Sequence, residues 1–300
     1  MKTKIKFENV DFNSTSGPNN FGSKLRRALE SGSDFQFVES NPDVQISFIE
    51  SHNNFDKTIL RLDGIYFNSE FDWKKQNYNI EKSYNDSKSV VIQSMFDLEL
   101  ITKYFGKREG LNVIRNGTCK DLIDKIPEAT INLSNEDSKI WLSASSWRPH
   151  KRLNENIRIF NELSDENDVM LIAGPNTSNI HDTDRIKYIG NLSWENLISL
   201  MKVSDNFIHA AWLDHCPNVV VDAKAAGCKL YCSSAGGTKE LASEKDTVFI
   251  EEEWDFKPCK LYEPPKLNLD NFKSGIYAGG YDIKESAGKY KEAIKGVLGW

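Results

Sequence analysis

The chain has 300 residues, of which 39% are hydrophobic and 27% charged, and its formal net charge is −6. This composition is that of a soluble globular protein with one large or two modest domains. The acidic balance argues against a surface that coats nucleic acid, although it leaves room for a local basic cleft. No apolar run approaches the length of a membrane span, the N-terminus carries no signal segment, and the five cysteines form no CxxC pair, so we expect a cytoplasmic protein with reduced thiols.

Short apolar runs alternate with helical patterns in the first half of the chain, which is typical of a parallel sheet built from α/β units. The predicted strands are Ile5–Val10, Phe35–Glu39, Val44–Ile49, Thr58–Leu62, Ser89–Gln93 and Asn112–Ile114. The predicted helices are Phe21–Glu30, Ile80–Asn85 and Phe96–Phe105. The polar segment Pro127–Ser138 then interrupts the pattern and indicates a linker between two domains.

The second half repeats the alternation. The predicted strands are Ile140–Ala144, Val169–Ala173, Ile186–Ile189, Phe207–Ala211, Leu230–Ser233 and Val248–Glu251. The predicted helices are Leu153–Leu163, Trp194–Lys202, Asn218–Ala226 and, after an irregular stretch from Trp254 to Gly280, Ile283–Val297. Two α/β domains are therefore expected, with ligands at the carboxyl ends of the strands.

The most informative stretch is Asn206–Leu241, in which a strand, an acidic loop, a helix and a second strand follow one another. Asp214 lies just before the helix that opens at Pro217, and Asp222 lies eight residues further on. The free N–H groups of a helix start attract a diphosphate, and two carboxylates can accept hydrogen bonds from sugar and ribose hydroxyls. Downstream, the Gly-rich turn Ser233–Glu240, which contains Gly237, predicts a second anion cradle. The pattern favours a nucleotide-sugar site.

A cluster of cations, SSWRPHKR, follows the strand Ile140–Ala144. Its cations, Arg148, Lys151 and Arg152, could stabilise the negative charge that accumulates on a departing phosphate group. A solvated helix start is the simpler alternative, but cations there oppose the helix dipole, and such a mismatch signals an anionic partner. Ser146 lies in the same cluster.

Several weaker signals occur elsewhere in the chain. A Gly-rich segment with Gly17 and Asn20 follows the first strand, Asp63 ends the strand Thr58–Leu62 in the sequence RLDG, and Asn116-Gly117 follows the last strand of the first half. Each has a plain alternative, namely an ordinary βα turn or a turn residue before glycine. The Asp182-Thr-Asp184 pair is interpreted as a solvated loop rather than a metal site, and no cluster of His and Cys suggests zinc.

Taken together, the acid-x7-acid spacing of Asp214 and Asp222, the Arg148/Lys151 pair and the Gly-rich segments resemble retaining GT-B glycosyltransferases of family 4 (group 1). The resemblance is clearest over residues 110–245. It implies two Rossmann-like α/β domains that face a central cleft: an acceptor-side domain at 1–130, short for the family, a donor domain at 131–280, and a final helix at 281–300 that can pack back on the first domain. It implies transfer of a hexose-like sugar from a UDP- or GDP-linked donor to an acceptor hydroxyl, without metal or further cofactor.

The resemblance also implies roles for individual residues. Arg148, Lys151, Asp214 and Asp63 are the expected catalytic residues. The expected donor-binding residues are Gly17, Asn20, Ser146, Arg152, Gly174, Asn191, Leu192, Pro217, Asn218, Val219, Asp222 and Gly237. In this family Glu usually stands where this chain has Asp214 and Asp222, so the carboxylates reach about one methylene less far, roughly an ångström.

Three other functions stay open at this point. A GT-B sugar epimerase would share the fold and the donor, a non-catalytic subunit would bind the donor without transfer, and a glycosyltransferase could act on modified nucleic acid bases, which the pI of about 5.5 disfavours. The acceptor is open among glycans, lipid-linked and small molecules. A homo-oligomer is compatible with the short first domain.

Overall fold

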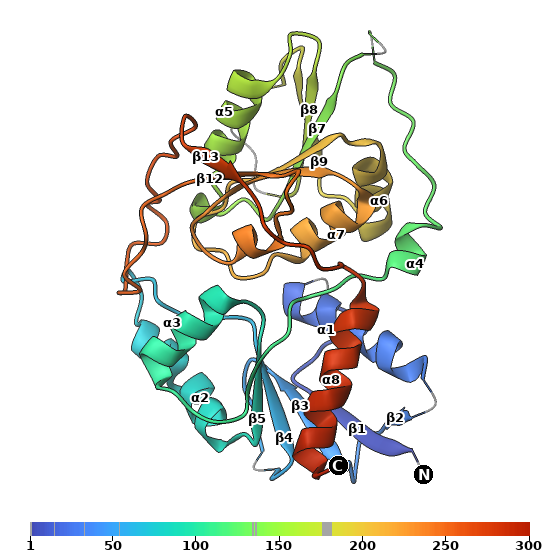
Figure 1. Ribbon diagram of the computed structural model, residues 1–300, viewed down its shortest axis with the longest axis vertical. Coiled ribbons are helices and arrows are strands. Elements are labelled where there is room, and N and C mark those ends of the chain that lie inside the picture. Colours follow the sequence, from blue (N-terminus) through green and yellow to red (C-terminus); the bar gives the residue numbers. More distant parts are fainter. Residues whose placement is uncertain are drawn as a thin grey trace. The chain divides into compact units, whose positions relative to one another are not determined.

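The computed structural model describes residues 2–14, 16–32, 34–53, 55–133, 135, 137–175 and 182–300. The chain divides into two compact units, each built around its own sheet (Figure 1). The first unit comprises Met1–Cys119, Phe256–Cys259 and Asp282–Trp300. The second comprises Lys120–Asp255 and Lys260–Tyr281. The chain thus crosses between the units more than once, and its last helix belongs to the first unit.

The first unit contains a parallel sheet in the order β2-β1-β3-β4-β5-β6. Its strands are β1 (Thr3–Glu8), β2 (Phe35–Phe37), β3 (Val44–Phe48), β4 (Thr58–Leu62), β5 (Ser89–Ile92) and β6 (Leu111–Val113). Every residue of β3, β4 and β5 is buried, as expected for central strands covered on both faces.

The helices of the first unit are α1 (Gly17–Glu30), α2 (Trp73–Asp86), α3 (Met95–Phe105) and α8 (Ile283–Leu298). Three of them begin at side chains that accept a backbone N–H: Asp72 for α2, Ser94 for α3 and Asp282 for α8. Helix α8 lies along α1 (Figure 1), with the rings of Phe21 and Tyr290 6.2 Å apart. The C-terminal helix therefore completes the core of the first unit, which the N-terminal part of the chain forms.

The described residues between β3 and β4 form no helix. Instead of a packed helix, hydrogen bonds to the carboxylate of Glu8, at the end of β1, hold this loop against the sheet. The carboxylate accepts hydrogen bonds from Ser51 Oγ at 2.9 Å, from the His52 N–H at 3.3 Å and from Asn53 Nδ2 at 2.6 Å. A buried carboxylate is stable only when it accepts hydrogen bonds, and here the loop supplies the donors. This requirement fixes the position of the loop.

The second unit contains a sheet in the order β13-β12-β11-β10-β7-β8-β9. Its strands are β7 (Ile140–Ala144), β8 (Val169–Ala173), β9 (Ile186–Gly190), β10 (Asn206–His209), β11 (Lys229–Ser233), β12 (Thr247–Phe249) and β13 (Phe272–Ser274). All pairings are parallel except that of β12 with β13. Its helices are α4 (Lys120–Ile123), α5 (Leu153–Leu163), α6 (Trp194–Val203) and α7 (Asn218–Ala226), with 3-10 turns η1 (Pro149–Lys151) and η2 (Thr238–Leu241).

The core of the second unit has two layers because side chains alternate along each strand. Leu142 of β7 and Phe207 of β10 belong to one apolar cluster, whereas Trp141 and Ile208, their neighbours in the chain, belong to the other. Both faces of the sheet are thus covered. This leaves the ends of the strands, and the loops that follow them, as the places where polar chemistry can gather.

The predicted elements agree closely with the structure, with several differences. Helix α2 begins at Trp73 rather than Ile80, because Asp72 caps a polar first turn that carries no apolar period. Helix α1 begins at Gly17, so the segment expected as a loop is helical. The turn after β11 leads into the 3-10 turn η2. Strand β13 lies within the stretch expected to be irregular.

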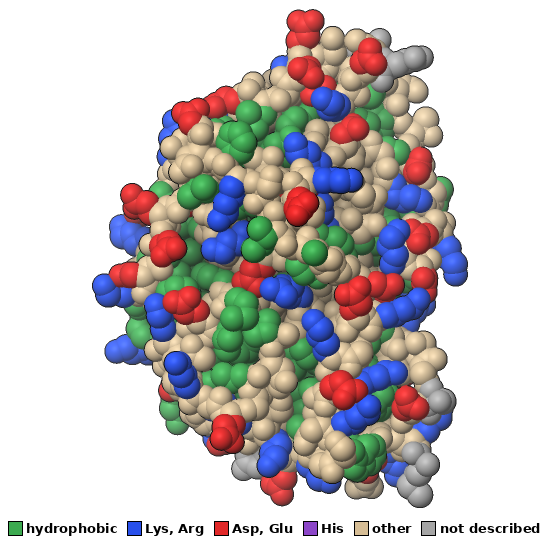
Figure 2. Space-filling view, viewed as in Figure 1, with side chains coloured by type: hydrophobic (Ala, Val, Ile, Leu, Met, Phe, Trp, Pro, Cys, Tyr) green, Lys and Arg blue, Asp and Glu red, His purple; other side chains and the backbone are tan. Residues whose placement is uncertain are grey.

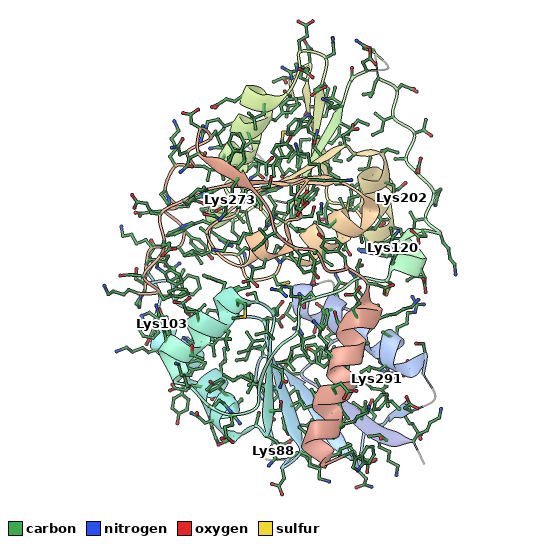
Figure 3. The ribbon with its side chains drawn as sticks, in the orientation of Figure 1. Lys88, Lys103, Lys120, Lys202, Lys273 and Lys291 are labelled. Carbon is green, nitrogen blue, oxygen red and sulfur yellow. The ribbon has the colours of Figure 1, made fainter. Side chains whose placement is uncertain are left out.

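Charged side chains of both signs are interspersed over the face shown in Figure 2. Several lysines labelled in Figure 3 have local partners: Lys103 pairs with Glu99 at 3.1 Å, and Lys202 donates to the carbonyl of Ile126 at 2.7 Å. No helix in the described ranges has the length and apolarity needed to cross a membrane.

Candidate functional site

The strongest candidate site is built where β10 ends and α7 begins, in the second unit. Pro217 is the N-cap of α7, with φ −66° and ψ 119°, and its carbonyl accepts the N–H of Val220 at 3.0 Å. Pro217 has no N–H group, and the backbone N–H groups of a first helical turn attract anions. The start of α7 is therefore a candidate anion-binding position.

Asp214 lies in the loop before this helix and is largely buried. Its Oδ2 lies 2.6 Å from Lys151 Nζ and 2.8 Å from His209 Nε2, and its Oδ1 accepts the N–H of His215 at 3.0 Å. Burial by itself would raise the pKa of Asp214. The Lys151 ammonium and the hydrogen bond from His209 outweigh that effect and hold the pKa well below its usual range. Asp214 is therefore a charged, oriented carboxylate.

The three cations of the SSWRPHKR segment have different environments. The Lys151 ammonium reaches Asp214, as described above. The Arg152 guanidinium is buried and bound to Glu251 at 2.8 and 2.7 Å and to the carbonyl of Pro265 at 2.7 Å. Arg148 is exposed, and its guanidinium makes no hydrogen bond or ion pair with the residues that the structure describes. Arg148 and Lys151 thus keep donors for an anion, whereas Arg152 supports the fold.

The backbone turn η1 separates these side chains. Arg152 has the left-handed φ of 51° and caps α5, so its side chain leaves the segment in a different direction from that of Lys151. His150, one residue before Lys151, is buried and stacks on Tyr262 with ring centroids 5.7 Å apart. Burial, helped by the charge of Lys151, lowers the pKa of His150 to about 3, so this ring is neutral at physiological pH.

The Gly-rich turn after β11 docks directly on the acidic loop. The N–H of Gly237 donates to the carbonyl of Asp214 at 2.7 Å. At Gly236, which has φ +91°, a Cβ atom would lie 2.5 Å from that same oxygen. Only glycine allows this approach. The two segments that the sequence singled out separately are therefore one structure.

Asp222 lies one turn into α7 and is buried. Its Oδ2 accepts the indole N–H of Trp194 at 2.9 Å. Trp194 is the first residue of α6, so the start of one helix holds the acid of another. The carboxylate is fixed in position by this contact.

Other predicted donor-binding residues lie at the carboxyl ends of β7, β8 and β9. Gly174 has φ +123°, and a Cβ there would lie 1.9 Å from the carbonyl oxygen of Ser145. Its N–H donates to the carbonyl of Gly190 at 2.8 Å. Ser146 and Asn191 are exposed at the ends of these strands, and Leu192 packs against the core. They share an edge of the sheet, as expected for a parallel arrangement.

The remaining predicted residues, Gly17, Asn20 and Asp63, belong to the first unit. Gly17 and Asn20 lie in the first turn of α1, and the Asn20 N–H donates to Ser16 O at 2.9 Å. Asp63 pairs with Arg61 and accepts a hydrogen bond from Gln93 Nε2 at 2.9 Å. Asp63 is thus held by neighbouring side chains at the ends of β4 and β5.

The turn at Asn116-Gly117 also has a structural role in the first unit. The Asn116 amide accepts from Arg61 Nη2 at 2.9 Å and donates to Gln93 at 2.6 Å. A Cβ at Gly117 would lie 2.7 Å from the backbone of Ile283, so glycine is needed for α8 to approach. This explains the residue pair by packing.

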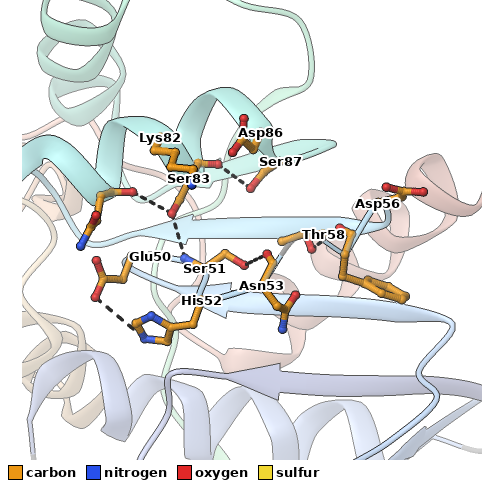
Figure 4. A pocket seen from close by; sticks show the side chains of 12 residues that line it. Glu50, Ser51, His52, Asn53, Asp56, Thr58, Lys82, Ser83, Asp86 and Ser87 are labelled. Carbon is orange, nitrogen blue, oxygen red and sulfur yellow. Dashed lines mark hydrogen bonds and ion pairs between the residues drawn. The ribbon is translucent and has the colours of Figure 1, made fainter.

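The first unit also contains a cavity of about 460 Å³ between the β3–β4 loop and α2 (Figure 4). It is lined by polar side chains, among them His52 and Lys82, and the Ser51 N–H donates to Ser83 Oγ at 2.9 Å. None of the predicted site residues lines this cavity among the described residues. No three His, Cys, Asp or Glu side chains gather as metal ligands in the described ranges of the chain.

Sequence reasoning missed His209 and Trp194, which hold the two acids. His209 had a weak signal, since it is the last strand residue before the acidic loop, where strand ends and ligand-binding loops meet. Trp194 had none, because its contact with Asp222 joins residues 28 positions apart through the packing of α6 on α7.

Comparison with known proteins gives an independent view of these features. Residues 124–256 match the family model of glycosyl transferases group 1. This part of the chain is therefore a group 1 glycosyltransferase domain, and the chain has the GT-B fold. This confirms the expected family, the two-sheet α/β fold and the enzyme class, a retaining glycosyltransferase.

The similar solved structures are distant in sequence. Sucrose-phosphate synthase from Thermosynechococcus elongatus has a TM-score of 0.65 at 12% identity, over 99% of this chain and 95% of that one. Anabaena HepE in complex with UDP has a TM-score of 0.65 at 12% identity, over 99% and 100%. A glycosyltransferase from Rickettsia africae has a TM-score of 0.62 at 17% identity, over 99% of both chains. None of the curated proteins matches the sequence.

Proposed function

We propose that this glycosyltransferase moves a hexose-like sugar from a nucleotide-diphosphate sugar to a hydroxyl of a glycan, a lipid-linked or a small-molecule acceptor. The transfer retains the configuration at the anomeric carbon and uses no metal. The donor binds to the second unit, at the start of α7. Uracil is the first candidate for the base, because the similar Anabaena HepE was crystallised with UDP and with UDP-glucose.

The observation that carries this proposal is the convergence at Asp214. A charged carboxylate, the Lys151 ammonium and the N–H groups at the start of α7 meet in one loop, with the exposed Arg148 in the adjoining segment. A nucleotide sugar needs this combination, since its diphosphate requires cations and N–H donors while its sugar hydroxyls require an acceptor.

In this proposal the protein contributes mainly position and charge. Arg148, Lys151 and the N–H groups of Asn218 and Val219 hold the diphosphate and stabilise the charge that develops as it leaves. Asp214 accepts a hydrogen bond from a sugar hydroxyl, and Asp222 contacts the ribose. The leaving phosphate oxygen takes the proton of the acceptor hydroxyl, which attacks the same face of an oxocarbenium-like sugar.

The roles of several residues stay predictions. Ser146, Gly174, Asn191 and Leu192 are proposed to hold the base and its ribose through backbone groups. The roles expected for Gly17, Asn20 and Asp63 likewise stay predictions. Among the cations, the contacts of Arg152 with Glu251 favour a structural role, so Arg148 and Lys151 are our candidates for the diphosphate.

The experiment that tests this proposal is a thermal-shift panel of UDP, GDP, CDP, ADP and their sugar conjugates, with and without EDTA. A ligand that binds only the folded state raises the midpoint, by several degrees at about 100 times its Kd. We expect one nucleotide series to raise the midpoint with and without EDTA, and Arg148→Ala to abolish the shift.

The matched control is Lys273→Ala, which removes an exposed cation from β13 of the same unit (Figure 3). We expect this variant to keep the full shift. The proposed donor site is wrong if no nucleotide raises the unfolding midpoint of the wild-type protein. It is also wrong if Lys273→Ala loses as much of the nucleotide-induced shift as Arg148→Ala.

A further inference from the structure

The buried histidine at the end of β10 has a direct contact with the proposed sugar-binding acid. His209 is 4% exposed, and its Nε2 lies 2.8 Å from Asp214 Oδ2. It comes from the strand, whereas Lys151 reaches the same oxygen from η1. The carboxylate is therefore held from two elements, the strand β10 and the turn η1.

The chemistry of the two groups fixes the state of the ring. An ionised carboxylate can only accept hydrogen bonds, so His209 must donate from Nε2. Burial lowers the pKa of His209 more than the nearby carboxylate raises it, so the ring is neutral. A neutral ring that donates from Nε2 carries its single proton there, which leaves Nδ1 as an acceptor.

The number of hydrogen bonds on Asp214 has a further consequence. A carboxylate offers about four acceptor positions, two on each oxygen. Oδ2 receives Lys151 and His209, and Oδ1 receives the N–H of His215. One position, on Oδ1, is left. The Lys151 ammonium, which contacts Asp214 alone among the described residues, keeps two N–H bonds for a phosphate.

We propose that His209 is a positioning residue that donates its Nε2 proton to Asp214, holds the carboxylate against Lys151, and leaves a single acceptor on Oδ1 for one hydroxyl of the donor sugar. The inference rests on the proposed donor site. It assigns His209 a role in the orientation of Asp214 and Lys151, although the ring itself does not touch the substrate.

Two substitutions separate this role from simple packing. His209→Leu fills the site with an apolar side chain that cannot donate a hydrogen bond. The side-chain amide of His209→Gln can donate in place of the imidazole Nε2. Loss of a hydrogen bond to a charged group is worth roughly 10- to 100-fold. We expect His209→Leu to lower kcat for sugar release by at least ~10-fold with KM within about threefold, and His209→Gln to recover to within about threefold of wild type.

The kinetics use the nucleotide sugar that gives the largest thermal shift, with UDP-glucose as the first probe. The matched control is Ser143→Ala, which removes a buried hydrogen bond of 2.9 Å from β7 to the carbonyl of Ile208 without contact to Asp214. We expect it to keep the wild-type kcat. A His209→Leu enzyme with wild-type kcat, or a His209→Gln enzyme as poor as His209→Leu, overturns the proposal.

A second measurement needs neither a folded variant nor activity. Nitrogen-15 NMR of the wild-type imidazoles reports the tautomer of each ring. The His209 signals are assigned by their loss in His209→Gln or, if that variant does not fold, through backbone-correlated spectra. We expect the Nε2-protonated neutral form from pH 8 to about pH 6. An imidazolium or an Nδ1-protonated ring overturns the inference. If no nucleotide sugar binds, the proposed function is wrong. The tautomer then still tests whether His209 Nε2 donates to Asp214.

Discussion

Glu8 in the first unit and Asp214 in the second are two largely buried carboxylates that are each held by several donors, and they differ in the kind of donor that holds them. Glu8 in the first unit is bound by Gln45, Ser47 and three groups of the β3–β4 loop, five donors in all. Asp214 in the second unit is bound by Lys151, His209 and the His215 N–H.

The donors decide the difference. All five donors to Glu8 are neutral groups of the fold, four of them on Oε2 and one on Oε1, so this carboxylate serves to hold the loop. Asp214 is bound by a cation and two neutral donors, and the cation keeps N–H bonds for a ligand. The comparison teaches that hydrogen bonding alone does not mark a functional acid. A neighbouring cation with spare donors is a better sign.

The sharpest test of this comparison is the loss of charge at Asp214. In Asp214→Asn the Lys151 ammonium loses its counter-ion, and the amide nitrogen faces an N–H donor whichever way it is turned. We expect kcat for sugar release to fall by about 10²- to 10³-fold, measured by steady-state kinetics with the donor found in the nucleotide panel. Asp124→Asn, an exposed acid of the same unit, should stay near wild type. An Asp214→Asn enzyme within fivefold of wild type would contradict the proposed role.

The same substitution at Glu8 should affect stability instead. In Glu8→Gln one oxygen becomes an N–H₂ group that meets donors in a buried site, which costs about 2–3 kcal/mol of unfolding free energy. Urea unfolding followed by circular dichroism measures the loss. The folded variant should keep its activity. Glu30→Gln, at an exposed pair on α1, should change stability by less than about 0.5 kcal/mol. Equal losses of unfolding free energy in the two variants would show that the hydrogen bonds to Glu8 do not stabilise the protein.

The smallest effect concerns the buried ring of His150, whose pKa is lowered by burial more than the nearby Asp214 raises it. Its folded pKa of about 3 lies below that of the unfolded chain, so acidification protonates the unfolded state first and stability falls as the pH drops below about 6.5. Between pH 7.5 and 5 the wild type should lose about 2 kcal/mol more than His150→Phe, which keeps the stack on Tyr262.

Unfolding curves at several pH values test this prediction. His52→Phe is the control, because the His52 side chain is 58% exposed. Parallel pH dependence of the wild type and His150→Phe would show that the buried ring does not resist protonation.

Much of the fold could be predicted because its signals are local. Thr58–Leu62, Ile140–Ala144 and Leu153–Leu163 were predicted with their observed bounds, since apolar runs and helical periods mark them directly. The start of α2 was wrong because its first turn is polar and depends on the cap at Asp72. Strand β13 was missed because three exposed residues become a strand only when β12 lies beside them.

The sequence alone determined which kinds of groups surround the proposed site: acids eight residues apart, cations after a strand, and glycines where the chain must turn. Only the tertiary structure decided how they pair. Lys151 and Arg152 are neighbours in the chain, yet one binds Asp214 and the other Glu251, 63 and 99 positions away. The left-handed backbone at Arg152 sends the two side chains apart, and the sheet brings each to a different strand end. Local sequence sets the chemistry of a side chain, whereas its partner is set by contacts that the chain makes over long separations.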